Sequence, residues 1–331
     1  MMKRILLTTK AVIKDNLSSR ATWFFIIFFP LFLTLIFALG FGAGTQVHQY
    51  VVVNNQQLGK YINQSQLFTA IYGTNEREAM LRGYIFVNVT NGKVNIYYPQ
   101  NDKYLVPSLE AIITEYYDKS SPVIFNEHQS SANAYYVYVV SGMIGVIALS
   151  NGVFGVTGVA SGYYRDKLID RLAASPLRSY EWVVSLVIYE IVITLISTVP
   201  ILLLSIVFGV IPIVGVAFLG FLVISTLMFS GLGAIIFGLT PKDKLFVANV
   251  AANVITIPLM FLSTAFFEID AFPSILRPLV EYQPVSVIDA VIRDVMVYGQ
   301  VPSLFDVFYI VLLTLAFIAV GSKLMKLRET D

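Results

Sequence analysis

A cluster of charged residues near the middle of the sequence is the feature best suited to contact another protein. The stretch from Gly162 to Glu181, GYYRDKLIDRLAASPLRSYE, follows a long uncharged run and precedes a mostly apolar one. Ser175-Pro176 prevents one continuous helix, because proline lacks the backbone N–H that a helix interior needs. We expect a short helix, a break and a second helix that enters a bilayer, so that the loop is open to a partner. Six charged residues lie within fourteen positions of it: Arg165, Asp166, Lys167, Asp170, Arg171 and Arg178.

One ionisable residue, Glu190, lies inside an apolar run, about 12 Å of helix beyond Trp182. An ionised group at the bilayer centre costs on the order of 3 kcal/mol on insertion scales, so an intramembrane carboxylate suggests a functional site. The structural alternative, which we favour, is a protonated or hydrogen-bonded group that holds the helix bundle together. Asn151, Asn249 and Asn253 raise the same question, and hydrogen bonding between helices is the default for them.

Motifs of catalytic chemistry are absent from the sequence. The two Gly-Lys pairs, Gly59-Lys60 and Gly92-Lys93, lack the upstream glycine of a phosphate-binding loop, and neither HExxH nor GxSxG occurs. Cysteine is absent, and His48 and His128 are far apart in a polar region, which makes a metal site improbable. We therefore expect no enzyme activity, no cofactor and no ATP hydrolysis by this chain itself.

The composition indicates an integral membrane protein. Of 331 residues, 56% are hydrophobic and 13% are charged, and the mean hydropathy is +0.73; soluble domains have about 25% charged residues. The net charge of +1 implies neither a nucleic acid nor an acidic partner.

The hydropathy pattern predicts an α-helical polytopic protein with six transmembrane helices and a small α/β domain between the first two. The first apolar run is longer than the roughly 7 to 15 residues of a signal-peptide core, so we expect it to be retained. The expected spans are residues 21–44, 134–162, 182–208, 214–240, 245–267 and 303–322. The segments between and beside them are an amphipathic helix at 1–20, the α/β domain at 45–133, the charged loop at 163–181, amphipathic or re-entrant helices at 268–302 and a tail at 323–331.

Residues 45–133 differ in composition from the spans that flank them. The alternating stretch YIFVNVTNGKVNIYY predicts a hairpin around Asn91-Gly92, a strong two-residue turn signal. Apolar residues at helical spacing predict a helix from Tyr104 to Tyr117.

Lysine and arginine predict the orientation in the membrane. Fourteen of them lie near one set of helix ends and two, Arg277 and Arg293, near the other, with the inserted domain left out of the count. We expect both termini, the charged loop and the loop at Pro241 in the cytoplasm, the α/β domain outside, and the chain in the cell membrane. In the N-terminal segment, Lys3, Lys10 and Lys14 share one face, while Ile5, Leu6, Val12 and Ile13 share another.

The layout resembles that of ABC-2 type permeases, the membrane subunits of ATP-binding-cassette exporters. Two segments carry the resemblance: RDKLIDRLAASPLRSYEWV from Arg165 to Val183, in which Leu168-Ile169 replaces the family's usual Gly-Thr, and FFEIDAFPSILRPLVEYQPVSVIDAVIRDVMVYG from Phe266 to Gly299. The resemblance implies a permease that pairs with a second copy or a related permease and binds a separate ABC ATPase, which would hold ATP and Mg²⁺. It also implies an ATPase-coupling surface made by the N-terminal helix and a charged helix from Arg165 to Arg171. The implied contacts are Arg165, Asp166, Lys167, Asp170, Arg171, Lys10 and Lys14.

By the same resemblance, the substrate leaves outward through a cleft between two copies, lined by the second and fifth spans. The polar groups expected there are Asn249, Asn253, Thr256 and Ser263. Because this path is mostly apolar, hydrophobic or amphipathic substrates, drug-like or lipid-like, are expected, as in multidrug efflux. Two alternatives remain: a secondary transporter or channel with Glu190 as a proton-coupling group, and a receptor or adhesion anchor that acts through the external domain.

Overall fold

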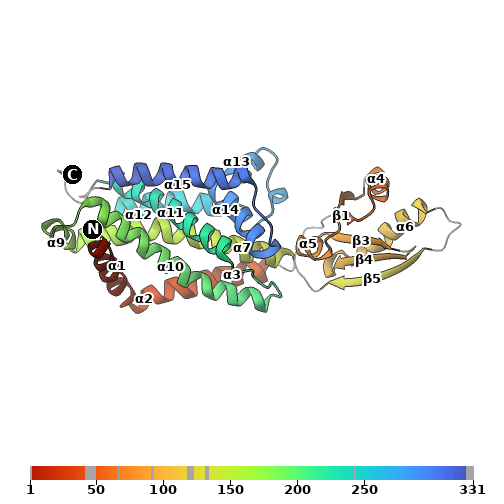
Figure 1. Ribbon diagram of the computed structural model, residues 1–331, viewed down its shortest axis with the longest axis horizontal. Coiled ribbons are helices and arrows are strands. Elements are labelled where there is room, and N and C mark those ends of the chain that lie inside the picture. Colours follow the sequence, from red (N-terminus) through yellow and green to blue (C-terminus); the bar gives the residue numbers. More distant parts are fainter. Residues whose placement is uncertain are drawn as a thin grey trace. The chain divides into compact units, whose positions relative to one another are not determined.

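The computed structural model describes residues 2–41, 50–65, 67–90, 93–117, 123–130, 134–241 and 244–325. The chain divides into two compact units (Figure 1). The bundle unit comprises Met1–Leu35, Tyr138–Leu204 and Pro212–Asp331, and the α/β unit comprises Ile36–Val137 and Ser205–Ile211.

Long apolar helices dominate the described residues outside the sheet. Four are long and apolar enough to cross a membrane: Tyr136–Arg165, Ser179–Val207, Val216–Leu239 and Leu304–Leu324. Two shorter apolar helices, Ile26–Gly40 and Phe246–Phe261, lie within the expected first and fifth spans. The first belongs to a helical path that runs without a break from Arg20 to Phe41, with one π-helical turn; the last residues of that expected span, 42–44, lie outside the described residues.

Apart from α4 to α6 and η2, which accompany the sheet, the helices in chain order are α1 (Met2–Leu17), α2 (Arg20–Trp23), the π turn η1 (Phe24–Phe28), α3 (Phe29–Phe41), α7 (Ala134–Ser150), the π turn η3 (Asn151–Gly155), α8 (Val156–Arg165), α9 (Leu168–Ala174), α10 (Ser179–Val207), α11 (Val216–Leu239), α12 (Phe246–Phe261), η4 (Ile269–Ala271), α13 (Arg277–Tyr282), α14 (Pro284–Arg293), the π turn η5 (Asp294–Tyr298) and α15 (Leu304–Leu324).

Helix α11 packs closely against α15 in the bundle unit. A Cβ built on Gly231 of α11 would lie 2.8 Å from the backbone nitrogen of Ile318, closer than real side chains approach. Small residues permit such backbone contact, and van der Waals packing of this kind holds membrane helices together where lipid offers no hydrophobic driving force. Phe229 and Phe237 on the same helix are also buried.

The α/β unit contains a five-stranded mixed sheet with the strand order β2-β1-β3-β4-β5. Strand β1 is parallel to both β2 and β3, β3 is antiparallel to β4, and β4 is parallel to β5. The strands are β1 (Tyr50–Val53), β2 (Thr69–Tyr72), β3 (Ile85–Thr90), β4 (Lys93–Pro99) and β5 (Ile124–Ser130), and the helices are α4 (Gln56–Gln64), α5 (Glu76–Leu81), η2 (Gln100–Leu105) and α6 (Val106–Tyr116).

Alternation along the strands distributes the core between the two faces of this sheet. Val51 and Val53 pack with residues of α4 and α6, whereas Val52 packs with Ala79 and Met80 of α5. The antiparallel pairing of β3 with β4 confirms the predicted hairpin, although Asn91-Gly92 itself lies outside the described residues. Helix α6 confirms the predicted helical periodicity.

The charged loop differs from the prediction in one respect, because no single helix runs from Arg165 to Arg171. Helix α8 ends at Arg165, Lys167 has the left-handed backbone conformation (φ 52°), and α9 begins only at Leu168. The N–H of Lys167 bonds the carbonyl of Tyr164 at 3.1 Å, which satisfies an acceptor at the end of α8. The predicted break at Ser175-Pro176 is present, and α10 follows it.

The segment before α15 contains the two short helices expected there, α13 and α14. Helix α14 is not amphipathic in its packing, because its valine and isoleucine residues and its charged residues Asp289 and Arg293 are all buried. It is therefore an internal part of the bundle unit rather than a surface helix.

Candidate functional site

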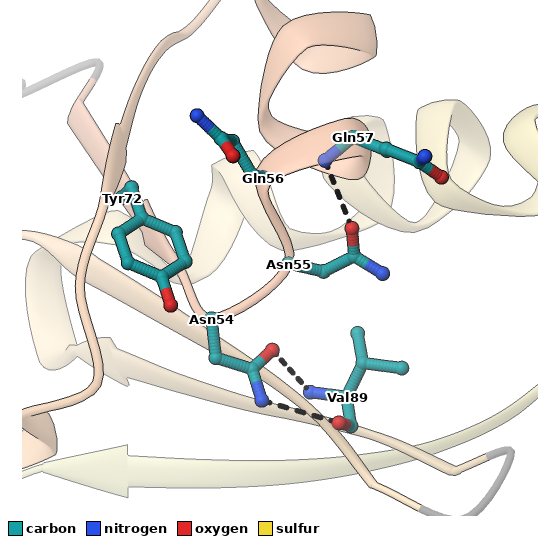
Figure 2. Close-up of a pocket in the computed structure, with 6 residues that line it drawn as sticks. All are labelled: Asn54, Asn55, Gln56, Gln57, Tyr72 and Val89. Atoms are coloured by element: carbon teal, nitrogen blue, oxygen red, sulfur yellow. Dashed lines mark hydrogen bonds between the residues drawn. The ribbon is translucent and has the colours of Figure 1, made fainter.

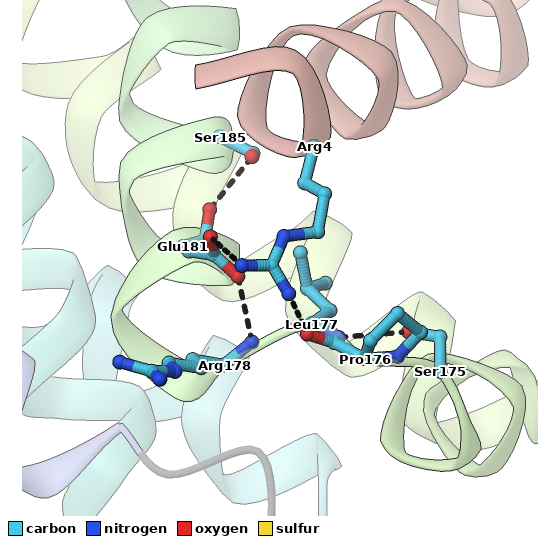
Figure 3. Close-up of polar contacts among 7 residues, drawn as sticks. All are labelled: Arg4, Ser175, Pro176, Leu177, Arg178, Glu181 and Ser185. Atoms are coloured by element: carbon cyan, nitrogen blue, oxygen red, sulfur yellow. Dashed lines mark hydrogen bonds and ion pairs between the residues drawn. The ribbon is translucent and has the colours of Figure 1, made fainter. Parts of the chain in front are cut away.

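The N-terminal helix α1 is fixed to the start of α10 by polar contacts (Figure 3). Arg4 Nη2 lies 3.3 Å from Glu181 Oε1, and Arg4 also donates a hydrogen bond to the carbonyl oxygen of Pro176. Ser185 Oγ donates to the Ile5 carbonyl at 3.2 Å. One arginine thus joins α1 both to α10 and to the loop before it.

Glu181 also stabilises the first turn of α10. Its Oε2 accepts the backbone N–H of Arg178 at 3.0 Å, as the glutamate of a capping box does for the residue three positions earlier. The side chain is fully buried. Sequence reasoning missed this residue, although a glutamate in the first turn of an apolar helix, just after Ser-Pro, is a signal that could have identified it.

A shared apolar core holds α1, α9 and α10 together. Val12, Ile169, Leu177 and Trp182 belong to one buried cluster. On α1 the buried stripe is Ile5, Thr9 and Val12, whereas Leu6, expected on the same apolar face as Ile5 and Val12, is 56% exposed. The one-turn spacing of the buried residues gives α1 one packed side and leaves its lysines free to project outward.

The charged side chains of the loop project from this core. Arg165, Asp166, Lys167, Asp170 and Arg171 are all exposed, as are Lys10 and Lys14 of α1. Arg165 Nε donates to Asp166 Oδ1 at 3.0 Å, and this hydrogen bond lowers the pKa of the Asp166 carboxyl. Charges on a firmly packed scaffold are available to a partner, and we call these seven exposed charges, together with α1 and α9, the coupling surface.

Glu190 is a residue of α10, and its side chain lies against η3 in the interior of the bundle unit. Its side chain is 1% exposed, and it lies so close to Gly155 that a Cβ built on that glycine would be 2.1 Å from its Cδ. Its Oε1 has no hydrogen-bond partner among the described residues. Four positions before Gly155, Asn151 Nδ2 donates to Thr194 Oγ1 and Ser197 Oγ, each at 3.3 Å, which joins η3 to α10.

A cavity of about 660 Å³ adjoins Glu190. Residues of the α2–α3 path, of α7–α8, of α10 and of α12 line it, and most of their side chains are apolar. A volume between about 300 and 1,000 Å³ is typical of small-molecule sites.

Of the four expected substrate-path residues, only Asn253 lines this cavity. Asn253 and Asn249 are exposed on α12, one turn apart, and Asn253 Nδ2 donates to the Asn249 carbonyl at 2.8 Å. Thr256 is buried, and Ser263 is engaged in the turn after α12, where it donates to the Met260 carbonyl. The four side chains thus have different environments: one lines the cavity, two are exposed and two are buried, with Asn253 counted in both of the first two groups.

A buried polar network after α12 was not foreseen from the sequence. Arg293 Nε donates to Ser141 Oγ at 3.0 Å, its Nη2 donates to the Thr264 carbonyl at 3.3 Å, and its guanidinium lies 3.6 Å from the centre of the Tyr138 ring. One turn earlier, Asp289 is completely buried. Glu190 is therefore not the only charged residue in the interior of the bundle unit.

The α/β unit has a polar hollow of about 380 Å³ near the carboxyl ends of β1 and β2 (Figure 2). Asn54 and Val89 line it and are joined by two hydrogen bonds: Asn54 Oδ1 accepts the Val89 N–H at 2.9 Å, and Asn54 Nδ2 donates to the Val89 carbonyl at 3.1 Å. Asn55 caps α4 by accepting the N–H of Gln57 at 2.9 Å. These amides serve the fold, so the hollow is a secondary candidate. Among the described residues, no cluster of His, Cys, Asp and Glu could hold a metal ion.

The long apolar helices are those of a multi-pass, helical membrane protein. A family model described as ABC-2 family transporter protein matches residues 20–323. The chain belongs to this family of ABC transporter permeases, which are membrane subunits that are generally not catalytic and that in general work with an ABC ATPase. The comparison with curated proteins found no match.

Proposed function

We propose that the chain is the permease of an ABC exporter that moves a hydrophobic or amphipathic substrate outward, powered by a separate ATPase subunit. The observation that carries this proposal is the coupling surface. A partner that pushes on exposed charges moves a transmembrane helix only if the charges are firmly attached to it. The Arg4–Glu181 ion pair and the core around Trp182 supply that attachment.

We further propose six spans with α1, α9 and the loop at Pro241 in the cytoplasm, the α/β unit outside, and the cell membrane as the location. The distribution of lysine and arginine supports this orientation. Since the chain has no cysteine, single cysteines at Lys60 and Asp170 would test it cleanly. We expect a membrane-impermeant maleimide to label Lys60→Cys in intact cells and Asp170→Cys only after lysis; the reverse pattern would overturn the orientation.

A dimer with a second copy or a related permease is part of the proposal. Apolar residues exposed on α12, namely Val250, Val254 and Ile257, together with the exposed Asn249 and Asn253, suit a helix that faces another chain across a substrate path. The buried Thr256 and Ser263 would act there only through rearrangement.

The decisive experiment is purification of the protein from its native membrane, followed by identification of the ATPase that accompanies it. The test variant reverses two exposed charges of α9, Asp170→Lys with Arg171→Glu. The matched control reverses two exposed charges of α5, Glu76→Lys with Arg77→Glu. We expect the α9 variant to insert normally but to lose the ATPase, whereas the control keeps it; retention by both would overturn the coupling surface.

The secondary-transporter alternative rests on Glu190 and is disfavoured by the family to which the chain belongs. Solute movement by the purified protein in liposomes without ATP would restore it.

A further inference from the structure

The cavity beside Glu190 combines apolar walls with one buried carboxylate. Side chains of Phe29, Leu33, Val146 and Ile193 contribute to the walls, together with Glu190. No lysine or arginine is among the described residues that line it. The local charge of this site is therefore set by Glu190.

The carboxylate is not neutralised by the protein around it. Its Oε1 is buried and has no hydrogen-bond partner among the described residues. Asn151, which also lines the cavity, directs its amide nitrogen to Thr194 and Ser197 rather than to the carboxylate. Burial of an unpartnered carboxylate is unfavourable, and an opposite charge nearby in a medium of low dielectric constant relieves that cost.

We propose that this cavity binds a lipophilic cation, with Glu190 as the counter-charge. The volume suits one drug-sized molecule, and the apolar walls would hold its hydrocarbon part. Phe29, Phe154 and Tyr189 add aromatic rings, whose faces attract cations. If the chain is an exporter, lipophilic cations would be its substrates, and this assignment rests on the proposed function. The binding of a cation in the cavity does not depend on that function.

Two hydrophobic ions of similar size and shape but opposite charge, tetraphenylphosphonium and tetraphenylborate, test the proposal. Equilibrium binding is measured on the full-length protein in lipid nanodiscs, with empty nanodiscs subtracted. We expect saturable binding of the phosphonium only, and a loss of roughly tenfold or more in its affinity in Glu190→Gln, because removing a desolvated ion pair weakens binding by at least that much. Glu190→Asp, which keeps the charge, should retain part of the affinity.

The matched control is Asp289→Asn, which removes another fully buried carboxylate, one outside the cavity lining. It should bind tetraphenylphosphonium as the wild type does. Equal binding of both ions, or unchanged phosphonium affinity in Glu190→Gln, would overturn the proposal and indicate a lipid-filled apolar cavity.

Failure of this inference can be separated from failure of the proposed function. Retention of the ATPase together with no phosphonium binding would reject the cation site alone. Phosphonium binding by a protein that has no associated ATPase would reject the exporter and leave the site intact.

Discussion

The carboxylate of Glu190 occupies the space in which a side chain at position 155 would lie. A Cβ on Gly155 would be 2.1 Å from the Cδ and Oε2 of Glu190, so any side chain at this position of the π turn η3 requires the Glu190 carboxylate to move. Single π turns inside α-helices frequently occur at functional sites. Here the turn places Asn151 and Gly155 against α10, on the lining of the cavity.

Replacing Gly155 with alanine should therefore push the flexible Glu190 side chain aside and destabilise the bundle unit. Because that side chain can move, we expect a loss of about 1 kcal/mol in the free energy of unfolding, the low end of the usual cost of overpacking. The fluorescence of Trp23 and Trp182 during thermal unfolding would report it. The control is Gly158→Ala, because a Cβ there meets no heavy atom within 4 Å; its stability should be unchanged or higher. Equal stability of the two variants would contradict the close contact.

Removing Arg4 should loosen α1. In Arg4→Ala, α1 loses the ion pair to the fully buried Glu181 and the hydrogen bond to Pro176, at a cost of roughly 1–2 kcal/mol because Arg4 is itself 39% exposed. Hydrogen exchange of the α1 amides should become faster. Lys3→Ala, at an exposed position of the same helix, is the control and should leave exchange unchanged. Slow exchange in Arg4→Ala would show that the apolar core alone holds α1.

Arg293 and Asp289 should respond to substitution to different degrees. Arg293→Met removes the hydrogen bonds to the Thr264 carbonyl and the Ser141 hydroxyl and leaves Asp289 buried without a nearby cation, so we expect a loss of about 3 kcal/mol or more. Asp289→Asn should cost less, because its carboxylate oxygens have no hydrogen-bond partners among the described residues and Arg293 keeps both of its hydrogen bonds. Denaturant unfolding measures both, and strong destabilisation by Asp289→Asn would reveal a partner for that carboxylate.

The α/β unit should lose stability as Glu110 ionises. Burial, and secondarily the charge of Glu127, raise the pKa of the Glu110 carboxyl above its usual 4.5. A raised acid pKa means that the folded state binds the proton more tightly. The stability it contributes is fully present below about pH 4.5 and is lost as the pH rises through the folded-state pKa.

Carbon-13 NMR titration of the Glu110 carboxyl in the full-length protein would measure this shift directly. Glu127→Gln should lower the midpoint, because it removes the charge that contributes to the shift. Glu115→Gln, at an exposed position of α6, should leave the midpoint where it is. An unchanged midpoint in Glu127→Gln would show that burial alone sets the pKa.

Features that depend on neighbouring residues were predictable from the sequence. Helical periodicity identified α6, and strand alternation with a turn signal identified the β3–β4 pairing. The charged loop was correctly predicted to be exposed, but the predicted start of its helix was wrong. Lys167 has the left-handed backbone conformation, which lysine rarely adopts, so its residue type did not indicate a break there.

Features that depend on residues far apart in the sequence were not predictable. Glu181 was missed because its partner Arg4 is far from it in the sequence. Arg293 was counted as a charge beside a helix end, although Ser141 and Thr264 bind it in the interior. Neither hydropathy nor periodicity carries information about which helix faces which.

By itself, the sequence determined the class of protein, most of its long apolar helices and the two segments that resemble ABC-2 permeases, because each is a sum over adjacent residues. The tertiary structure alone decided that Glu190 lies against Gly155, that Arg4 joins α1 to α10, and that a cavity separates the apolar helices beside a buried carboxylate. These relationships follow from the rotation and close approach of whole helices, which are fixed only when all their side chains pack together.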